Sequence, residues 1–276
     1  MNKLPVILLA ALAAIPVAAW IGLQVKPKPF PAYPERTPIL DTVDLPADLP
    51  APVARYYQAI VGDRVPVIES AVFTGRGHVR FAGIRFPARF RITHVAGQSY
   101  RHYIEATIFG FPLMKVNEHY LDGKSRLELP FGVIENEPKV DMAANLGLWA
   151  ESVWLPTIYI TDPRVRWEAM DDTTARLVVP FGEDEDTFTV TFDPQTGLLV
   201  KLEAMRWKET SDEAKTPWRN EALGWQTFHG IKIASPGTAT WIDEGAPWSV
   251  WIIEDVVYNA DVAEYIQARG YSVKEF

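Results

Sequence analysis

Residues 75–92, GRGHVRFAGIRFPARFRI, contain five arginines and one histidine but no acidic side chain. Between Glu69 and Glu105 there are six arginines and still no Asp or Glu, although the whole chain has a net charge of −8. Guanidinium groups bind carboxylates and phosphates through paired hydrogen bonds. This concentration of arginine in an acidic protein therefore predicts a surface that pairs with anions.

The spacing of these arginines predicts one face of a β-hairpin. A turn at Ala82-Gly83 places Arg80 opposite Arg85, and successive side chains of a strand point to opposite faces. Phe86 and Phe90 then point to the other, apolar face. The arginines assigned to the polar face, here called the arginine face, are Arg76, Arg80, Arg85, Arg89 and Arg91. Like charges opposite each other cost up to about 1 kcal/mol per pair, so a partner must offset the repulsion.

The arginine face has two interpretations. Acidic side chains from the C-terminal half of the chain can pair with it and give a solvated, ion-paired surface. Alternatively, it meets anionic material, either the acidic head of a ligand or phospholipid headgroups, where a basic residue gains about 1 kcal/mol. Nucleic acid is not expected as a partner, because the field of an acidic chain opposes its binding.

Two histidines and one glutamate are the other candidates for chemistry. An expected turn between His94 and His102 would place them opposite each other, as two metal ligands or as a solvated pair. No third ligand lies at a diagnostic spacing, so we predict no metal site. Glu151 lies between Trp149 and Trp154, where burial would raise its carboxyl pKa as a general acid requires. It could instead lie on the polar side of a helix or pair with an arginine, and we assign no catalytic residue.

Several classes of site are excluded by what the sequence lacks. There is no cysteine, which excludes disulfides, thiolate zinc sites and thiol nucleophiles. There is no Gly-x-Ser-x-Gly motif, no His-Glu-x-x-His motif and no phosphate-binding glycine loop, and we expect no cofactor. The ten Trp, ten Tyr and thirteen Phe suit a β core and the walls of a ligand cavity.

The N-terminal residues are expected to position the domain. Residues 4–25 carry no formal charge and are long enough to cross a hydrocarbon core of about 30 Å. We therefore predict a membrane anchor or a cleavable signal over residues 1–25. Residues 26–52 are predicted to be a proline-rich spacer, made semi-rigid by polyproline II geometry. Because the domain follows this segment, we expect it outside the cytoplasm, either anchored to the cell membrane or secreted.

Residues 53–276 are predicted to form one β-rich domain. From Glu69 onward, apolar and polar residues alternate and turn signals recur at intervals of about ten residues, which predicts an antiparallel meander. Strands are expected near residues 70–81, 84–95, 99–109, 113–121, 164–169, 174–180, 187–193, 198–207, 219–228, 231–241 and 248–258. The expected fold is a curved antiparallel meander or half-barrel with an inserted helix.

The inserted helix is predicted from Asp141 to Leu155, where apolar residues recur at spacings of three and four. Asp141 is the expected N-terminal cap, and the apolar stripe makes the helix amphipathic. Shorter helices are expected over residues 53–61 and 262–268, ending at Gly62 and Gly270.

The runs LPAPVARYYQAIVGD (49–63) and LWAESVWLPT (148–157), with Pro217-Trp218, resemble an uncharacterised prokaryotic domain family. The resemblance implies an N-terminal membrane segment and brings no accepted activity. At the level of architecture, a meander around an inserted helix is similar to the lipoprotein-carrier half-barrels of bacterial envelopes, which fold around acyl chains. Fold alone does not set function.

We therefore expect a membrane-anchored, non-enzymatic module that binds a lipid or another amphiphile. Trp149, Trp154, Glu151, Phe86 and Phe90 are predicted to line the cavity, and the arginine face is predicted to meet the anionic head or the bilayer. The first alternative is a scaffold that binds another envelope protein, which a flat apolar patch in place of a pocket would favour. The second is a hydrolase that uses Glu151.

Overall fold

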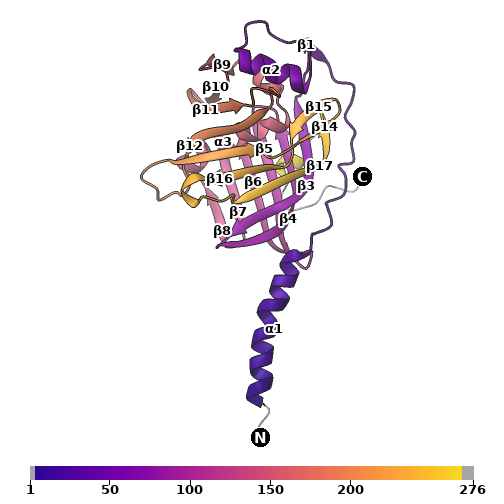
Figure 1. Cartoon of the computed structure of the whole chain (residues 1–276), viewed down its shortest axis with the longest axis vertical. Helices are drawn as coiled ribbons and strands as arrows, with labels where there is room; N and C mark the ends of the chain where they lie inside the picture. Colours follow the sequence, from indigo (N-terminus) through magenta and orange to yellow (C-terminus); the bar gives the residue numbers. More distant parts are fainter. Residues whose placement is uncertain (1–3, 269–276) are drawn as a thin grey trace.

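A large curved sheet forms most of the molecule. The computed structural model describes residues 4–268, with side chains from residue 14 onward. Thirteen antiparallel strands form an open half-barrel, and helix α3 (Pro138–Glu151) crosses its concave side (Figure 1). In spatial order, the strands are β8 (Gly132–Glu135), β7 (Lys124–Leu129), β6 (Phe111–Leu121), β5 (Ser99–Ile108), β4 (Ile84–Val95), β3 (Ser70–Phe81), β17 (Ser249–Tyr258), β16 (Gly237–Trp241), β13 (Thr216–Ala222), β12 (Leu199–Arg206), β11 (Asp184–Phe192), β10 (Thr174–Phe181) and β9 (Arg166–Ala169). The predicted fold class is confirmed.

The hairpin of β3 and β4 has the predicted register. Arg80 pairs with Arg85 and Arg76 with Arg89, around a two-residue turn in which Ala82 and Gly83 both have positive φ. This conformation matches the right-handed twist of paired strands.

Two of the predicted strands each correspond to two shorter strands in the structure, because the chain leaves the large sheet between them. Residues 219–228 and 231–241 were each expected to be continuous, but β14 (Trp225–Phe228) and β15 (Ile231–Ala234) form a separate two-stranded sheet between β13 and β16. The sequence prediction also omitted β7 and β8. In the sheet, β8 is an edge strand of four residues, and so short a strand gives little alternation to detect.

Helix α3 is buried on all sides instead of amphipathic. It begins at Pro138, three residues before the predicted cap, and ends at Glu151 before a 3₁₀ turn over Ser152–Trp154. Asp141 lies in the first turn, where its carboxylate accepts hydrogen bonds from the Ser125 amide at 2.8 Å and from Lys124 Nζ at 2.9 Å. The carboxylate therefore ties the start of α3 to β7.

The remaining elements lie at the periphery of the sheet. They are α1 (Leu4–Gln24), β1 (Thr42–Asp44), α2 (Ala51–Ile60), β2 (Arg64–Pro66), α4 (Ile158–Thr161) and the 3₁₀ turns Ile242–Glu244 and Tyr265–Gln267. The last turn replaces the predicted helix over 262–268, and Gly270 lies outside the described residues. Helix α1 projects from one end of the half-barrel (Figure 1). Within the described part of the chain, no helix combines the length and hydropathy that crossing a membrane requires.

The proline-rich segment packs against the domain instead of extending freely from it. Phe30 and Tyr33 are buried, and the Phe30 ring lies 4.5 Å from the Arg89 guanidinium carbon and 5.7 Å from the Tyr103 ring. Cation–π contacts of this kind add about 0.5–2 kcal/mol to the burial of the ring. The segment is therefore held on the sheet by its aromatic side chains.

Candidate functional site

A cavity of about 480 Å³ lies between α3 and the concave face of the sheet. Four small residues of α3, Ala143, Ala144, Gly147 and Ala150, face this space. Across from them are apolar side chains of the sheet, including Ile92, Ile104 and Trp251. Protein interiors are otherwise close-packed, so short side chains along one helix are what keep this volume open. The concave pocket is the feature that the ligand-binding interpretation requires and the scaffold interpretation does not.

The predicted ligand-binding residues divide into two groups. Trp154 and Glu151 line the cavity. Trp149 is fully buried on another side of α3, with its ring 6.5 Å from that of Tyr159. Phe86 and Phe90 are buried as well but do not line the cavity.

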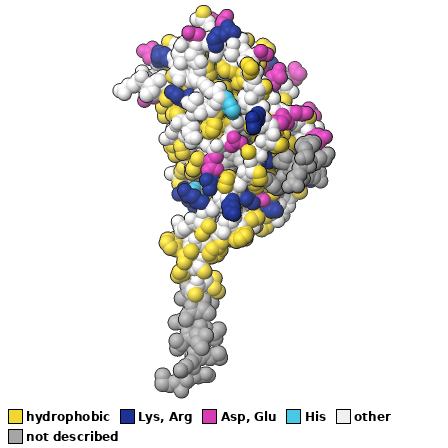
Figure 2. Space-filling view, turned by 90° about the vertical axis from the view of Figure 1, so that its right-hand side faces the viewer, with side chains coloured by type: hydrophobic (Ala, Val, Ile, Leu, Met, Phe, Trp, Pro, Cys, Tyr) yellow, Lys and Arg dark blue, Asp and Glu magenta, His cyan; other side chains and the backbone are white. Residues whose placement is uncertain are grey.

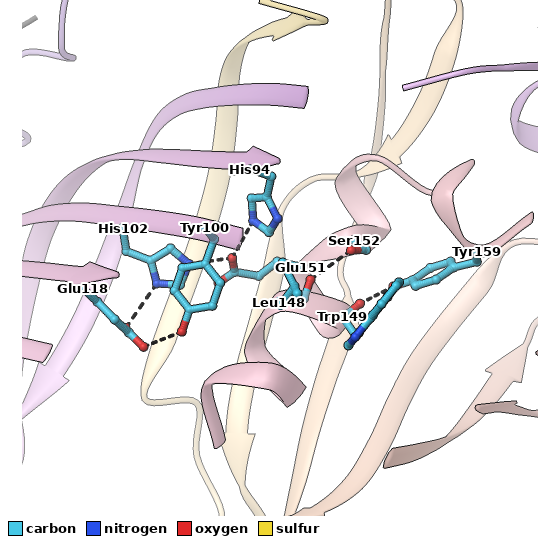
Figure 3. A network of polar contacts seen from close by, with 9 residues as sticks. All are labelled: His94, Tyr100, His102, Glu118, Leu148, Trp149, Glu151, Ser152 and Tyr159. Atoms are coloured by element: carbon cyan, nitrogen blue, oxygen red, sulfur yellow. Dashed lines mark hydrogen bonds and ion pairs between the residues drawn. The ribbon is translucent and has the colours of Figure 1, made fainter. Parts of the chain in front are cut away.

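A cluster of hydrogen-bonded polar side chains lies beside the cavity (Figure 3), and four of its members, Tyr100, His102, Glu118 and Glu151, line the cavity wall. His102 Nε2 lies 2.7 Å from Glu151 Oε2, and its Nδ1 lies 3.3 Å from Glu118 Oε2. His94 Nε2 lies 3.1 Å from the same Glu151 oxygen. The Tyr100 hydroxyl donates to Glu118 at 2.5 Å, and its ring stacks on that of His102 at 4.1 Å.

The pKa values of this cluster follow from its hydrogen bonds. Burial alone would raise the pKa of Glu151, but the charge and hydrogen bond of His102, with those of His94, lower it to about 2. Burial opposes the charge on His102, yet Glu151 and Glu118 raise its pKa to about 10. Burial lowers the pKa of His94. At neutral pH, His102 is therefore an imidazolium between two carboxylates, while His94 is neutral.

This result corrects the expectation for Glu151. Its pKa is lowered instead of raised, and its partners are histidines, not an arginine. A carboxyl group that is ionised at neutral pH has no proton to give, so this state does not fit a general acid. Arg206, which the sequence gave no reason to choose, also lines the cavity, and its Nε donates to the Ala143 carbonyl at 2.9 Å.

The predicted pairing of the two histidines was wrong, because each pairs with a residue two positions away from the other histidine. His94 pairs with Tyr100 and His102 with Ile92, because a three-residue loop joins β4 to β5 after Val95 pairs with Ser99. The two histidines therefore lie diagonally on one face. Glu118 joins them from β6 and Glu151 from α3. Contacts between such distant segments have no signal in local spacing.

The arginine face lies mostly outside the cavity. Arg80 is the one member of this face that lines the cavity wall. Arg76 pairs with Glu254 at 2.6 Å, Arg80 pairs with Glu244, and Arg89 pairs with Glu105 at 2.6 Å. Two of these acids come from the C-terminal half, as the ion-paired interpretation predicts.

Other contacts of the arginine face are made with neutral groups. Arg76, Arg89 and Arg91 also donate hydrogen bonds to backbone carbonyls of residues 27, 28 and 31, in the proline-rich segment. Arg85 contacts His78 Nδ1 at 3.0 Å. Acids, the docked segment and His78 therefore supply partners for the arginines that oppose each other in the hairpin.

Comparison with known proteins gives a family and a distant similarity to several solved structures. Residues 38–252 match a family of unknown function (DUF6544). The chain is similar to a DUF1329 family protein from Desulfovibrio piger, with 12% identity, a TM-score of 0.42 and coverage of 72% of this chain and 89% of the other. It is also similar to the LolA superfamily protein NE2245 from Nitrosomonas europaea, with 10% identity, a TM-score of 0.48 and coverage of 79% and 96%. No curated protein matches the sequence.

Proposed function

The chain belongs to the DUF6544 family of unknown function, and we propose that it binds the apolar part of a lipid or another amphiphile beneath α3, without catalysing a reaction on it. The observation that carries this proposal is the open cavity of about 480 Å³. Ligand sites are typically clefts of about 300–1,000 Å³ with mostly apolar walls. Burial of an acyl chain there gains about 0.8 kcal/mol per methylene.

The polar end of such a ligand would lie at the mouth of the cavity. Lys139, Lys208 and Glu209 line the cavity and are at least partly exposed to solvent. Lys208 already pairs with Asp243 and Glu244, and Lys139 donates to backbone carbonyls of residues 210 and 212. An anionic head would therefore exchange with partners that the protein supplies, which favours modest affinity and reversible binding.

Quenching of tryptophan fluorescence by a spin-labelled fatty acid tests this proposal. Five tryptophans line the cavity: Trp154, Trp207, Trp218, Trp248 and Trp251. The full chain, kept soluble with an amphipathic polymer, should show quenching that saturates at one equivalent above the linear background of the polymer. A short-chain spin label with the same head should give only the background. Quenching that never saturates would remove the support for a single lipid site.

We also propose that the N-terminal segment attaches the domain to a membrane, on its extracytoplasmic side. In support, residues 4–25 are uncharged, and exposed apolar residues surround the point where α1 meets the body (Figure 2). At this point the Phe109 amide donates to the Gly22 carbonyl at 2.8 Å, and Phe111 is 73% exposed. Aromatic rings near charged residues suit the interface of a bilayer.

The absence of cysteine makes the location directly testable. Asp184→Cys places a single thiol on an exposed hairpin. A membrane-impermeant maleimide should label this variant in intact spheroplasts. Labelling that requires lysis of the cells would place the domain in the cytoplasm and contradict the proposal.

A further inference from the structure

The polar cluster on the cavity wall has a second chemical interpretation besides a network of hydrogen bonds. We propose that His94, His102 and Glu151 bind one divalent transition-metal ion of the Zn²⁺ class. Two imidazoles with one carboxylate are a ligand set that such ions use in proteins. The three side chains come from β4, β5 and α3, so the fold assembles the set from separate elements.

The distances between the donor atoms suit a single ion. One atom from each residue lies within 4.8 Å of the other two. Glu151 Oε2 is 2.7 Å from His102 Nε2 and 3.1 Å from His94 Nε2. Two ligand atoms that are each about 2.0–2.1 Å from a tetrahedral ion lie roughly 3.3 Å apart. To bind one ion, the Glu151–His102 pair therefore needs to separate by roughly 0.6 Å and the Glu151–His94 pair by roughly 0.2 Å.

The surroundings of His102 resemble the outer shell of a metal site. Its Nδ1 faces Glu118 at 3.3 Å, and Glu118 is in turn held by the Tyr100 hydroxyl at 2.5 Å. A carboxylate that accepts from Nδ1 fixes the tautomer in which the Nε2 lone pair is free for a metal. His94 differs, because its Nδ1 is buried without a hydrogen-bond partner among the described residues. His102 and Glu151 should therefore bind the ion more strongly than His94.

Charge and access also favour a cation at this position. Two half-buried carboxylates, Glu118 and Glu151, lie within hydrogen-bonding distance of His102, and carboxylates withdrawn from water are stabilised by a cation close by. A divalent ion would replace the proton of the imidazolium in this role. Because His102 and Glu151 line the cavity, the ion would enter from there and keep one side open to solvent or ligand.

Metal uptake by the untagged full chain tests this proposal. After chelator treatment and dialysis, titration with Zn²⁺ should give about one ion per chain. Glu151→Gln, which keeps the size of the side chain, should lower the affinity at least about 100-fold. Glu118→Gln, which removes only the outer carboxylate, should lower it about 10–100-fold. His78→Gln is the matched control, because His78 lies outside the cluster and contacts Arg85, and it should bind zinc as the unaltered chain does.

Two further measurements decide cases in which a variant is unstable. The near-ultraviolet circular dichroism of each metal-free variant shows whether it is folded. The Co²⁺ absorption spectrum of the unaltered chain should show intense visible bands of a four- or five-coordinate site, and these should be lost when Zn²⁺ is added. A spectrum equal to that of aqueous Co²⁺, no stoichiometric zinc uptake, or uptake that survives Glu151→Gln would each overturn the proposal. Lipid binding is measured separately, so either proposal can fail alone.

Discussion

Substitutions at Gly147 can distinguish the effect of filling the cavity from a loss of protein stability. This residue lies on the cavity side of α3. A Cβ atom added there would be 3.7 Å from the Tyr100 hydroxyl oxygen and 4.0 Å from Arg206 Nη2, which are ordinary contact distances. Replacing a helical glycine by alanine removes an entropic penalty of about 0.5–1 kcal/mol. We therefore expect Gly147→Ala to raise the free energy of unfolding by that amount, or the Tm by about 1–4 °C.

A larger side chain at the same position should block the ligand. Gly147→Phe places a ring in the cavity, and we expect a loss of at least about tenfold in affinity for the spin-labelled fatty acid, equivalent to about 1.4 kcal/mol. Val200→Phe, which adds the same ring at an exposed position of β12, is the control and should bind normally. Urea denaturation confirms that each variant is folded. A folded Gly147→Phe that binds with unchanged affinity would show that the ligand is not in this cavity.

Three further predictions concern the docked segment, the pH dependence and the start of α3. Phe30→Ala should lower the free energy of unfolding by about 2–4 kcal/mol, because the ring is 4% exposed and contacts an arginine. As a control, Phe131→Ala, at a side chain that is 79% exposed, should change the free energy of unfolding by less than about 0.5 kcal/mol. Equal losses of stability for the two variants in urea denaturation would contradict the packing of Phe30 against the sheet. In chelator-treated protein, the raised His102 pKa of about 10 contributes stability that is fully present below pH 6.5 and is lost as the pH rises to 10. The lowered Glu151 pKa of about 2 contributes stability that is lost as the pH falls from 4.5 to 2. A urea midpoint that stays constant from pH 6.5 to 10 would show that His102 is not held as an imidazolium. Asp141→Ala should lower the free energy of unfolding by about 1–3 kcal/mol, because it leaves a buried amide of β7 without its hydrogen-bond acceptor. An unchanged urea midpoint would show that this hydrogen bond contributes nothing to stability.

The parts of the fold that could be predicted are those set by contacts close in the sequence. The hairpin of β3 and β4 had the correct register, because alternation along twelve-residue strands and a two-residue turn with glycine leave one register available. The next hairpin was shifted, because a three-residue loop changes the pairing without changing the alternation. Helix α3 was found, but not that it is buried on all sides, because burial depends on what surrounds it.

The candidate site was harder to predict because its parts meet only in three dimensions. Glu118 and Arg206 come from β6 and β12, and no spacing in the sequence connects them to His102. The docked segment did carry a local signal, since Phe30 and Tyr33 lie among the prolines. Aromatic side chains in a polyproline stretch favour packing against a surface, and the arginines needed partners. The aromatic residues and the arginines of the arginine face can both be found in the sequence. Nothing in the sequence shows that the proline-rich segment provides partners for these arginines.

The position of β17 within the sheet bears on how the chain is made. Six strands lie on each side of it, those from the first part of the chain beside β3 and those from the second part beside β16. The seventh and central strand is thus the last of the described strands to leave the ribosome. Until Ser249–Tyr258 is synthesised, β3 and β16 are open edges, and open edges invite pairing with other chains. A nascent chain stalled before this strand should be prone to aggregate, and a chain that crosses a membrane during synthesis should complete its sheet only on the far side.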